Sequence, residues 1–305
     1  MLYVFFLIFA GLLGLATGSF INVLTLRWQP DKGNKISKIL TGRSHCLSCG
    51  KTLRWFEIIP LISFLVLRGR CRYCHKKLSW QYPLIEGLTS LVFIGLTWRI
   101  LKLNFFYYYL LSDPRSNFWA IAVIILWYFY AAVLISLATI DFRHYLLPDR
   151  LIFPTMGISF LANLSFYFLS TTPNNAFPKF GLNFLGPYAN IINVHFNPFI
   201  SSLLGAIVLS AFLFLIYALS RGKAMGFGDV KLAALIGLML GLVGGIAALV
   251  FAFVWGAIIS LIIVLTTKKK LKDPVPFGPF LTLGVASVIF LGEIVINFYL
   301  SIFKG

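Results

Sequence analysis

Charged side chains are scarce in this sequence, and acidic ones are the scarcest. Asp, Glu, Lys and Arg together make up 11% of the 305 residues, and only nine residues are acidic. Soluble domains usually carry about 25% charged residues, so this composition excludes a water-soluble globular protein. Hydrophobic residues reach 59%, and the mean hydropathy is +0.90. The composition therefore predicts a membrane protein.

Uncharged apolar runs recur from one end of the chain to the other, and most are long enough to cross a bilayer core of roughly 30 Å. The first, residues 2–26, has no basic residue before it and exceeds the apolar core of a cleavable signal peptide, so we interpret it as a retained span. Seven further runs begin near residues 84, 118, 151, 199, 232, 246 and 280, and the run from 232 is short and ends at Gly244 and Gly245. We predict an all-α polytopic membrane protein with about eight transmembrane helices.

Basic residues are distributed unevenly among the segments between these runs. Four segments hold 21 of the 26 Lys and Arg residues: 27–83, 141–150, 221–231 and 268–279. By the positive-inside rule these four loops are cytoplasmic and both termini lie outside. The formal charge of +17 thus indicates topology and contact with anionic lipids, and no nucleic-acid partner is expected.

All four cysteines fall in the first cytoplasmic loop. They form two CxxC pairs with 21 residues between them: Cys46 and Cys49, then Cys71 and Cys74. Each CxxC turn directs two thiolates at one ion, and two such turns complete a tetrahedral zinc site. Two disulfides or four unused thiols are the alternative, which a reducing compartment disfavours. We predict a structural Cys₄ zinc site, with His45 and His75 as neighbours of the metal rather than ligands.

Two other cytoplasmic loops place an acidic residue against the end of a span. Asp141 follows the third span, and Asp229 precedes the sixth. An ionisable side chain at the edge of an apolar span is a functional-site candidate by default. Two carboxyl groups brought together would share one proton, so that one polarises a peptide carbonyl while the other activates water. Gly226 and Gly228 leave the backbone before Asp229 bare, which suits the approach of an extended substrate.

A structural interpretation of the same residues remains open. Asp141 could pair with Arg143, and Asp229 with Lys231, as interfacial ion pairs that take no part in catalysis.

At these residues the sequence resembles the bacterial type IV prepilin peptidase family, whose members are bifunctional leader peptidases and N-methyltransferases. The stretches that carry the resemblance are GSFINV at 18–23, RSHCLSC at 43–49, EIIPLIS at 57–63, RGRCRYC at 68–74, YPLIE at 82–86, DFRHYLLPD at 141–149, GFGDVKL at 226–232 and PFGPF at 276–280. Their order and spacing cover nearly the whole chain.

The resemblance implies that Asp141 and Asp229 are the paired catalytic aspartates of a membrane aspartic peptidase, with Asp149 in a supporting motif. It implies prepilin and pseudopilin substrates, cleaved after a glycine on the cytoplasmic side of the bacterial inner membrane. The cysteine-containing half would then methylate the new amino terminus, with S-adenosylmethionine as methyl donor. His75, where the family usually has glycine, and Gln81, where a basic residue is common, depart from the family pattern.

The expected domain order is a first helix at 1–26, a methyltransferase-associated zinc loop at 27–83, and a seven-helix peptidase domain at 84–303 with an outer loop at 171–198. A non-enzymatic scaffold whose basic zinc loop binds anionic lipid, nucleic acid or a cytoplasmic partner is the competing function. A transporter is disfavoured, because the acidic residues cluster at one face and no internal repeat is evident. Close approach of Asp141 to Asp229 would separate the enzyme from the scaffold.

Four small or polar residues have simple structural interpretations. Gly14 and Gly18 belong to a small-residue stripe that lets helices approach closely, and Asn22 is expected to form an interhelical hydrogen bond. Glu86 is expected to anchor the zinc loop through nearby Arg or Lys side chains.

Overall fold

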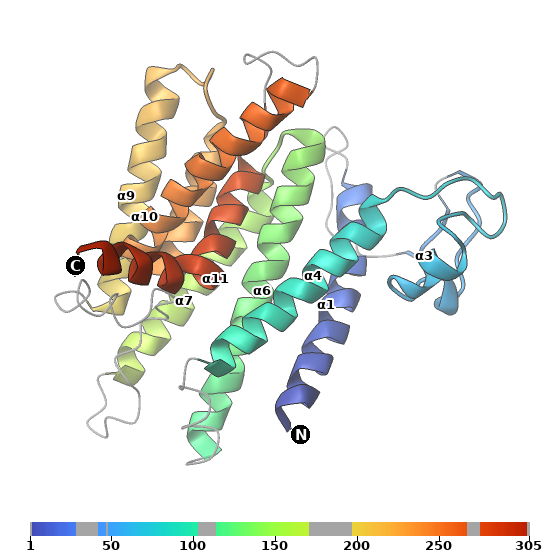
Figure 1. Cartoon of the computed structure of the whole chain (residues 1–305), viewed down its shortest axis with the longest axis horizontal. Coiled ribbons are helices and arrows are strands. Elements are labelled where there is room, and N and C mark those ends of the chain that lie inside the picture. Colours follow the sequence, from blue (N-terminus) through green and yellow to red (C-terminus); the bar gives the residue numbers. More distant parts are fainter. Residues whose placement is uncertain are drawn as a thin grey trace. The chain divides into compact units, whose positions relative to one another are not determined.

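The computed structural model describes residues 2–28, 42–46, 48–102, 114–170, 197–266 and 275–303. Over these residues the protein is helical, without a strand, and contains two isolated antiparallel bridges, His45 to Thr52 and Arg70 to Lys77. The helices, labelled in Figure 1, are α1 (Leu2–Arg27), the 3₁₀ helix η2 (Trp55–Glu57), α3 (Ile62–Val66), α4 (Gln81–Lys102), α6 (Pro114–His144), α7 (Asp149–Ser170), α9 (Pro198–Leu219), α10 (Phe227–Thr266) and α11 (Gly278–Phe303).

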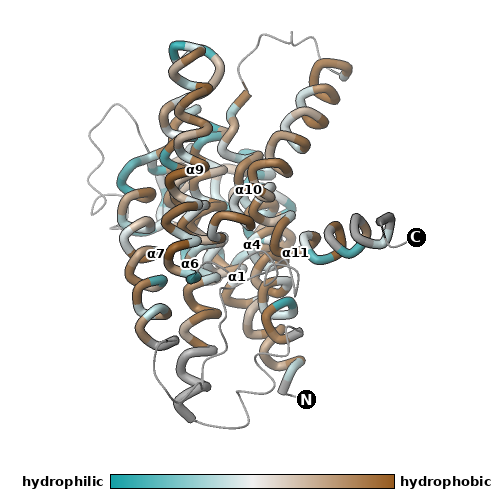
Figure 2. The backbone as a smooth tube through the Cα atoms, turned by 90° about the vertical axis from the view of Figure 1, so that its left-hand side faces the viewer, coloured by the Kyte–Doolittle hydropathy of each residue, from teal (hydrophilic) through white to brown (hydrophobic). Residues whose placement is uncertain are grey.

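Seven helices of the described part of the chain are long and apolar enough to cross a membrane, which confirms the all-α polytopic prediction. All eight predicted apolar runs are helical, but the sixth and seventh are joined in the 40-residue α10. Figure 2 shows hydrophobic residues over most of the length of α9 and α10. The outer loop predicted at 171–198 lies almost entirely outside the described residues.

The break in α10 lies at Gly241, three residues before the predicted position. Gly241 has φ 71° and ψ −175°, a conformation that residues with a Cβ rarely adopt. The backbone N–H of Leu242, beyond the break, donates to the Ser201 hydroxyl of α9 at 3.2 Å. A Cβ added to Gly205 of α9 would lie 2.7 Å from the carbonyl carbon of Gly241, so the two backbones are in contact at the break.

The chain divides into two compact units, Met1–Ser136 and Leu137–Gly305, with the division inside α6. In the first unit, α1 packs on α4 as the glycine stripe predicts. Cβ atoms added to Gly14 and Gly18 would lie 2.6 and 2.7 Å from the Cα atoms of Ser90 and Glu86, so only glycine allows this approach. The Asn22 side-chain amide donates to the Tyr82 carbonyl of α4 at 3.1 Å, which confirms the expected interhelical hydrogen bond.

In the second unit, α10 packs against α9, α11 and α7. Contact with α11 is close at Gly284, where a Cβ would collide with the Ala248 carbonyl of α10. Asn163 of α7 joins the same group, because its amide donates to the Leu238 carbonyl at 2.8 Å and its carbonyl oxygen accepts from Ser202 at 3.3 Å. These contacts fix the start of α10, where Asp229 lies, relative to the rest of the unit.

Candidate catalytic and metal sites

The four cysteines of the loop between α1 and α4 converge on one point. Their sulfur atoms all lie within 4.8 Å of one another, and the Sγ atoms of Cys46 and Cys74 are 3.9 Å apart. A tetrahedral site with Zn–S bonds of about 2.3 Å requires sulfur separations of roughly 3.8 Å. All four are free thiols, so the disulfide alternative is not adopted. The cluster can therefore hold a metal ion such as zinc.

The two CxxC turns have the same backbone design. The N–H of Cys46 donates to the Lys51 carbonyl and the N–H of Cys71 to the Lys76 carbonyl, each at 2.9 Å. In both turns the residue after the second cysteine is left-handed: Gly50 has φ 70° and His75 has φ 55°. Glycine adopts this conformation freely, whereas for a residue with a Cβ the left-handed conformation costs roughly 1–2 kcal/mol of conformational free energy. His75 is thus a strained substitute for glycine in the second turn.

The thiols of Cys46 and Cys74 have pKa values shifted in opposite directions. Burial raises the pKa of the Cys46 thiol, but backbone N–H groups of Cys49 and Ser48 donate to its sulfur and lower the pKa to about 6. The Lys76 N–H lowers the pKa of the Cys74 thiol, but burial and the three neighbouring cysteine sulfurs raise it to about 11. Because zinc binds thiolates, a zinc ion held by these cysteines would displace the proton of Cys74 at neutral pH.

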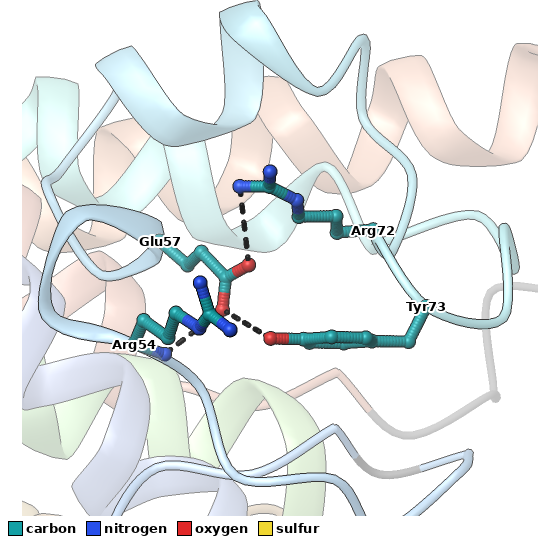
Figure 3. Close-up of polar contacts among 4 residues, drawn as sticks. All are labelled: Arg54, Glu57, Arg72 and Tyr73. Carbon is teal, nitrogen blue, oxygen red and sulfur yellow. Dashed lines mark hydrogen bonds and ion pairs between the residues drawn. The ribbon is translucent and has the colours of Figure 1, made fainter.

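A buried carboxylate supports the second CxxC turn. Glu57 is buried and accepts hydrogen bonds at Oε2 from the Arg54 backbone N–H at 2.8 Å and from the Tyr73 hydroxyl at 3.4 Å. Arg72 approaches the other oxygen, Oε1, at 3.8 Å (Figure 3). Arg72 and Tyr73 are the two residues between Cys71 and Cys74, so Glu57 ties η2 to the metal-binding turn.

Glu86 anchors the zinc loop, but by a contact other than the predicted one. Its Oε2 accepts the backbone N–H of Leu61 at 2.9 Å, rather than an Arg or Lys side chain. Leu61 precedes α3 and has φ 59°, so the hydrogen bond holds a left-handed residue against α4. Sequence alone could not identify this partner, because a backbone N–H carries no signature in the residue type.

Asp141 lies near the end of α6 and is 6% exposed. Its Oδ2 accepts the backbone N–H of Gly278, the first residue of α11, at 2.9 Å. A Cβ added to Gly278 would lie 2.7 Å from the same oxygen. Gly278 therefore both binds and sterically confines the Asp141 carboxylate, a role that the sequence analysis did not assign.

Asp229 lies in the first turn of α10 and is also 6% exposed. Its Oδ2 accepts the backbone N–H of Gly226 at 3.1 Å, which caps the start of the helix. A Cβ added to Gly228 would lie 2.9 Å from the Leu147 Cβ, so Gly228 admits the loop between α6 and α7. The two glycines thus orient Asp229 and allow this packing, in addition to the substrate approach predicted for them.

The two aspartates interact electrostatically, the charge of Asp141 acting on the carboxyl of Asp229. The arrangement brings two buried acidic side chains, from the ends of two membrane-spanning helices, within range of each other's charge.

Lys231 pairs with Asp149, the first residue of α7, at 2.6 and 2.8 Å from its two carboxylate oxygens. The Lys231 ammonium also lies over the rings of Phe153 and Phe227, 5.5 and 5.1 Å from their centroids. The ion pair between Asp229 and Lys231 considered from the sequence is therefore wrong. Asp149 instead links the start of α7 to the start of α10.

Two family models match the chain: the bacterial peptidase A24 N-terminal domain over residues 12–100, and the type IV leader peptidase family over residues 128–261. The type 4 prepilin-like proteins leader peptide-processing enzyme of Escherichia coli O78:H11 is 31% identical, over 91% of this chain and 91% of that protein. The prepilin leader peptidase/N-methyltransferase of Legionella pneumophila is 30% identical, over 97% and 95%. The protein of that name from Xanthomonas campestris is 28% identical, over 94% and 92%. No solved structure matches at comparable significance.

Proposed function

The chain belongs to the type IV leader peptidase family, and on this premise we propose that it cleaves the leader peptide of type IV prepilins or pseudopilins and methylates the new amino terminus. The observation that carries the peptidase assignment is the pairing of Asp141 with Asp229, two buried carboxyl groups 88 positions apart in sequence that interact through their charges. A scaffold would not need this pairing.

In the proposed reaction the two aspartates act as one acid and one base. The protonated carboxyl donates its proton to the scissile carbonyl oxygen, while the ionised carboxylate removes a proton from water. The water oxygen bonds to the carbonyl carbon. When the tetrahedral intermediate collapses, the C–N bond breaks, the aspartate that took a proton from water gives it to the leaving amine, and the proton on the former carbonyl oxygen returns to the other aspartate. Gly278 and Gly226 keep the two carboxylates in place through their backbone N–H groups.

The proposed site faces the cytoplasm, with both termini outside, because 21 of the 26 basic residues lie in the loops on that side of the predicted topology. A prepilin leader is short and basic and ends at a glycine before an apolar helix, so it would meet the aspartates at the membrane boundary. The chain is accordingly a multi-pass protein of the bacterial inner membrane.

We assign methyl transfer to the amino-terminal part, with the zinc loop at 27–83 as its support and S-adenosylmethionine as the donor, and peptide cleavage to residues 84–303. The geometry of the four cysteines suits a closed structural zinc site, which leaves no ligand position for substrate. Zinc would therefore shape the loop, as Glu57 does through Arg72 and Tyr73.

The test uses purified full-length protein and a synthetic prepilin. Sequencing the amino terminus of the product, with and without S-adenosylmethionine, measures both activities in one reaction. Asp229→Ala should abolish cleavage, yet a synthetic peptide that already has a mature amino terminus should still be methylated. Loss of both activities in a well-folded Asp229→Ala protein would contradict the separation of the two sites.

A further inference from the structure

The short helix α3 carries an apolar face that the described part of the chain leaves uncovered. Ile62, Leu65 and Val66 lie at positions i, i+3 and i+4, so their side chains share one side of the helix. All three are exposed, Leu65 by 72% and Val66 by 74%. The opposite side carries Phe64, which is buried against Trp80 with ring centroids 5.3 Å apart. Exposure of three neighbouring apolar side chains to water is unfavourable, so this face favours an apolar partner.

Two contacts hold α3 beside the start of α4, the end at which this membrane-spanning helix begins. Leu61, directly before α3, donates its N–H to Glu86, which lies five residues inside α4. At 1.5 Å per residue, this contact is roughly 7 Å along α4 from its first residue. Trp80 precedes α4 and packs on Phe64, and Trp is enriched where spans leave the hydrocarbon core. In Figure 1, α3 lies beside the end of α4 at which the chain enters that helix.

The helix α3 packs beside a surface that must already face lipid. Leu84, Leu88 and Leu91 recur at helical spacing and are all exposed on α4, a membrane-spanning helix, and the exposed Trp80 directly precedes that helix. Phe64 packs against Trp80, so α3 lies beside the start of this exposed stripe.

The charge around α3 identifies the lipid class. Between residues 42 and 80 there are eight Lys and Arg residues and one acidic residue, the buried Glu57. Two of the basic residues, Arg68 and Arg70, follow α3 directly and are exposed. Lys and Arg side chains near an anionic bilayer surface are attracted to it.

From these observations we propose that α3 is an interfacial helix, whose Ile62, Leu65 and Val66 side chains insert among anionic phospholipids and hold the zinc loop flat against the bilayer. Insertion would fix the metal-binding turns beside the membrane surface, where the amino terminus of a pilin helix emerges. The docking itself requires neither cleavage nor methyl transfer, so it stands or falls independently of the proposed function.

The test is to place an environment-sensitive fluorescent amino acid at Val66 in the full-length protein, reconstituted singly in nanodiscs containing phosphatidylglycerol. Matched probes at Lys51, on the exposed part of the zinc loop, and at Leu91, on the lipid-facing stripe of α4, define the two extremes. Bound zinc is measured in each variant to verify that the loop is folded. Quenching is measured with lipids brominated on the acyl chains and with aqueous acrylamide.

The Val66 probe should be quenched by brominated lipid at least half as strongly as the Leu91 probe, and should be several-fold less accessible to acrylamide than the Lys51 probe. Replacing phosphatidylglycerol by phosphatidylcholine should weaken lipid quenching at Val66 and leave it unchanged at Leu91. A zinc-loaded protein whose Val66 probe behaves like the Lys51 probe would overturn the proposal and indicate that the face binds protein instead. Equal quenching in both lipids would overturn its anionic selectivity.

Discussion

Gly278→Ala is expected to impair cleavage through Asp141 alone. The new Cβ would lie 2.7 Å from Oδ2, 3.2 Å from Cγ and 3.3 Å from Cβ of Asp141, so the carboxylate has to move by roughly 0.5–1 Å. The movement would break the 2.9 Å hydrogen bond from the Gly278 N–H, and a bond to a charged group contributes about 1.5–3 kcal/mol. Displacement of a reacting group by about 1 Å can cost about 10²-fold in rate. We therefore expect kcat for cleavage to fall about 10- to 100-fold, with little change in KM.

The assay follows the cleavage of a synthetic prepilin by mass spectrometry and, separately, methylation of a peptide with a mature amino terminus. Methylation should be unchanged, since Gly278 belongs to the second unit of the chain and not to the zinc loop. Gly157→Ala is the matched control, because a Cβ there would meet no atom within 4 Å. Near wild-type cleavage by a well-expressed Gly278→Ala protein would refute the assignment of Asp141 as a confined catalytic carboxylate.

Four further predictions concern the dyad, its support and the metal site. Cleavage should fall to nearly the same residual rate in Asp141→Asn, Asp229→Asn and the double variant, and near wild-type cleavage by either single variant would contradict the mechanism. Chelators should leave wild-type cleavage intact. Asp149→Asn should keep cleavage within several-fold of wild type, because an ion pair with a half-exposed carboxylate contributes at most about 1 kcal/mol. His75→Gly should relieve the left-handed strain by about 1 kcal/mol and slow zinc loss to a chelator about fivefold, whereas faster loss would show that the histidine itself stabilises the site. The apparent zinc dissociation constant should fall at least about tenfold per pH unit from pH 7 to 9. The reason is that the Cys74 thiol, whose pKa is raised to about 11, stays protonated in this range until the metal displaces its proton. A pH-independent dissociation constant in a competition titration would contradict this.

The sequence by itself determined the features that depend on local composition. Each membrane-spanning helix has its own apolar run in the sequence, because every apolar side chain placed in lipid stabilises the span. Every predicted run is helical in the structure. The CxxC spacing likewise identified the four cysteines, because a short turn is enough to place two thiolates on one ion. The sequence also showed that Asp141 and Asp229 lie at the ends of spans and are candidate site residues, because placing an acidic side chain within an apolar span is energetically unfavourable.

The tertiary structure decided which distant groups meet. The carboxylate of Asp141 is held by a glycine N–H 137 residues away, and Lys231 binds Asp149 across 82 residues rather than its near neighbour Asp229. Glu86 holds the Leu61 backbone instead of a basic side chain. These partners follow from how helices pack, and backbone N–H groups and glycine contacts leave no mark in residue type that spacing could reveal. Sequence therefore specified the helices and the chemical groups, whereas packing of the helices selected the partners that orient those groups.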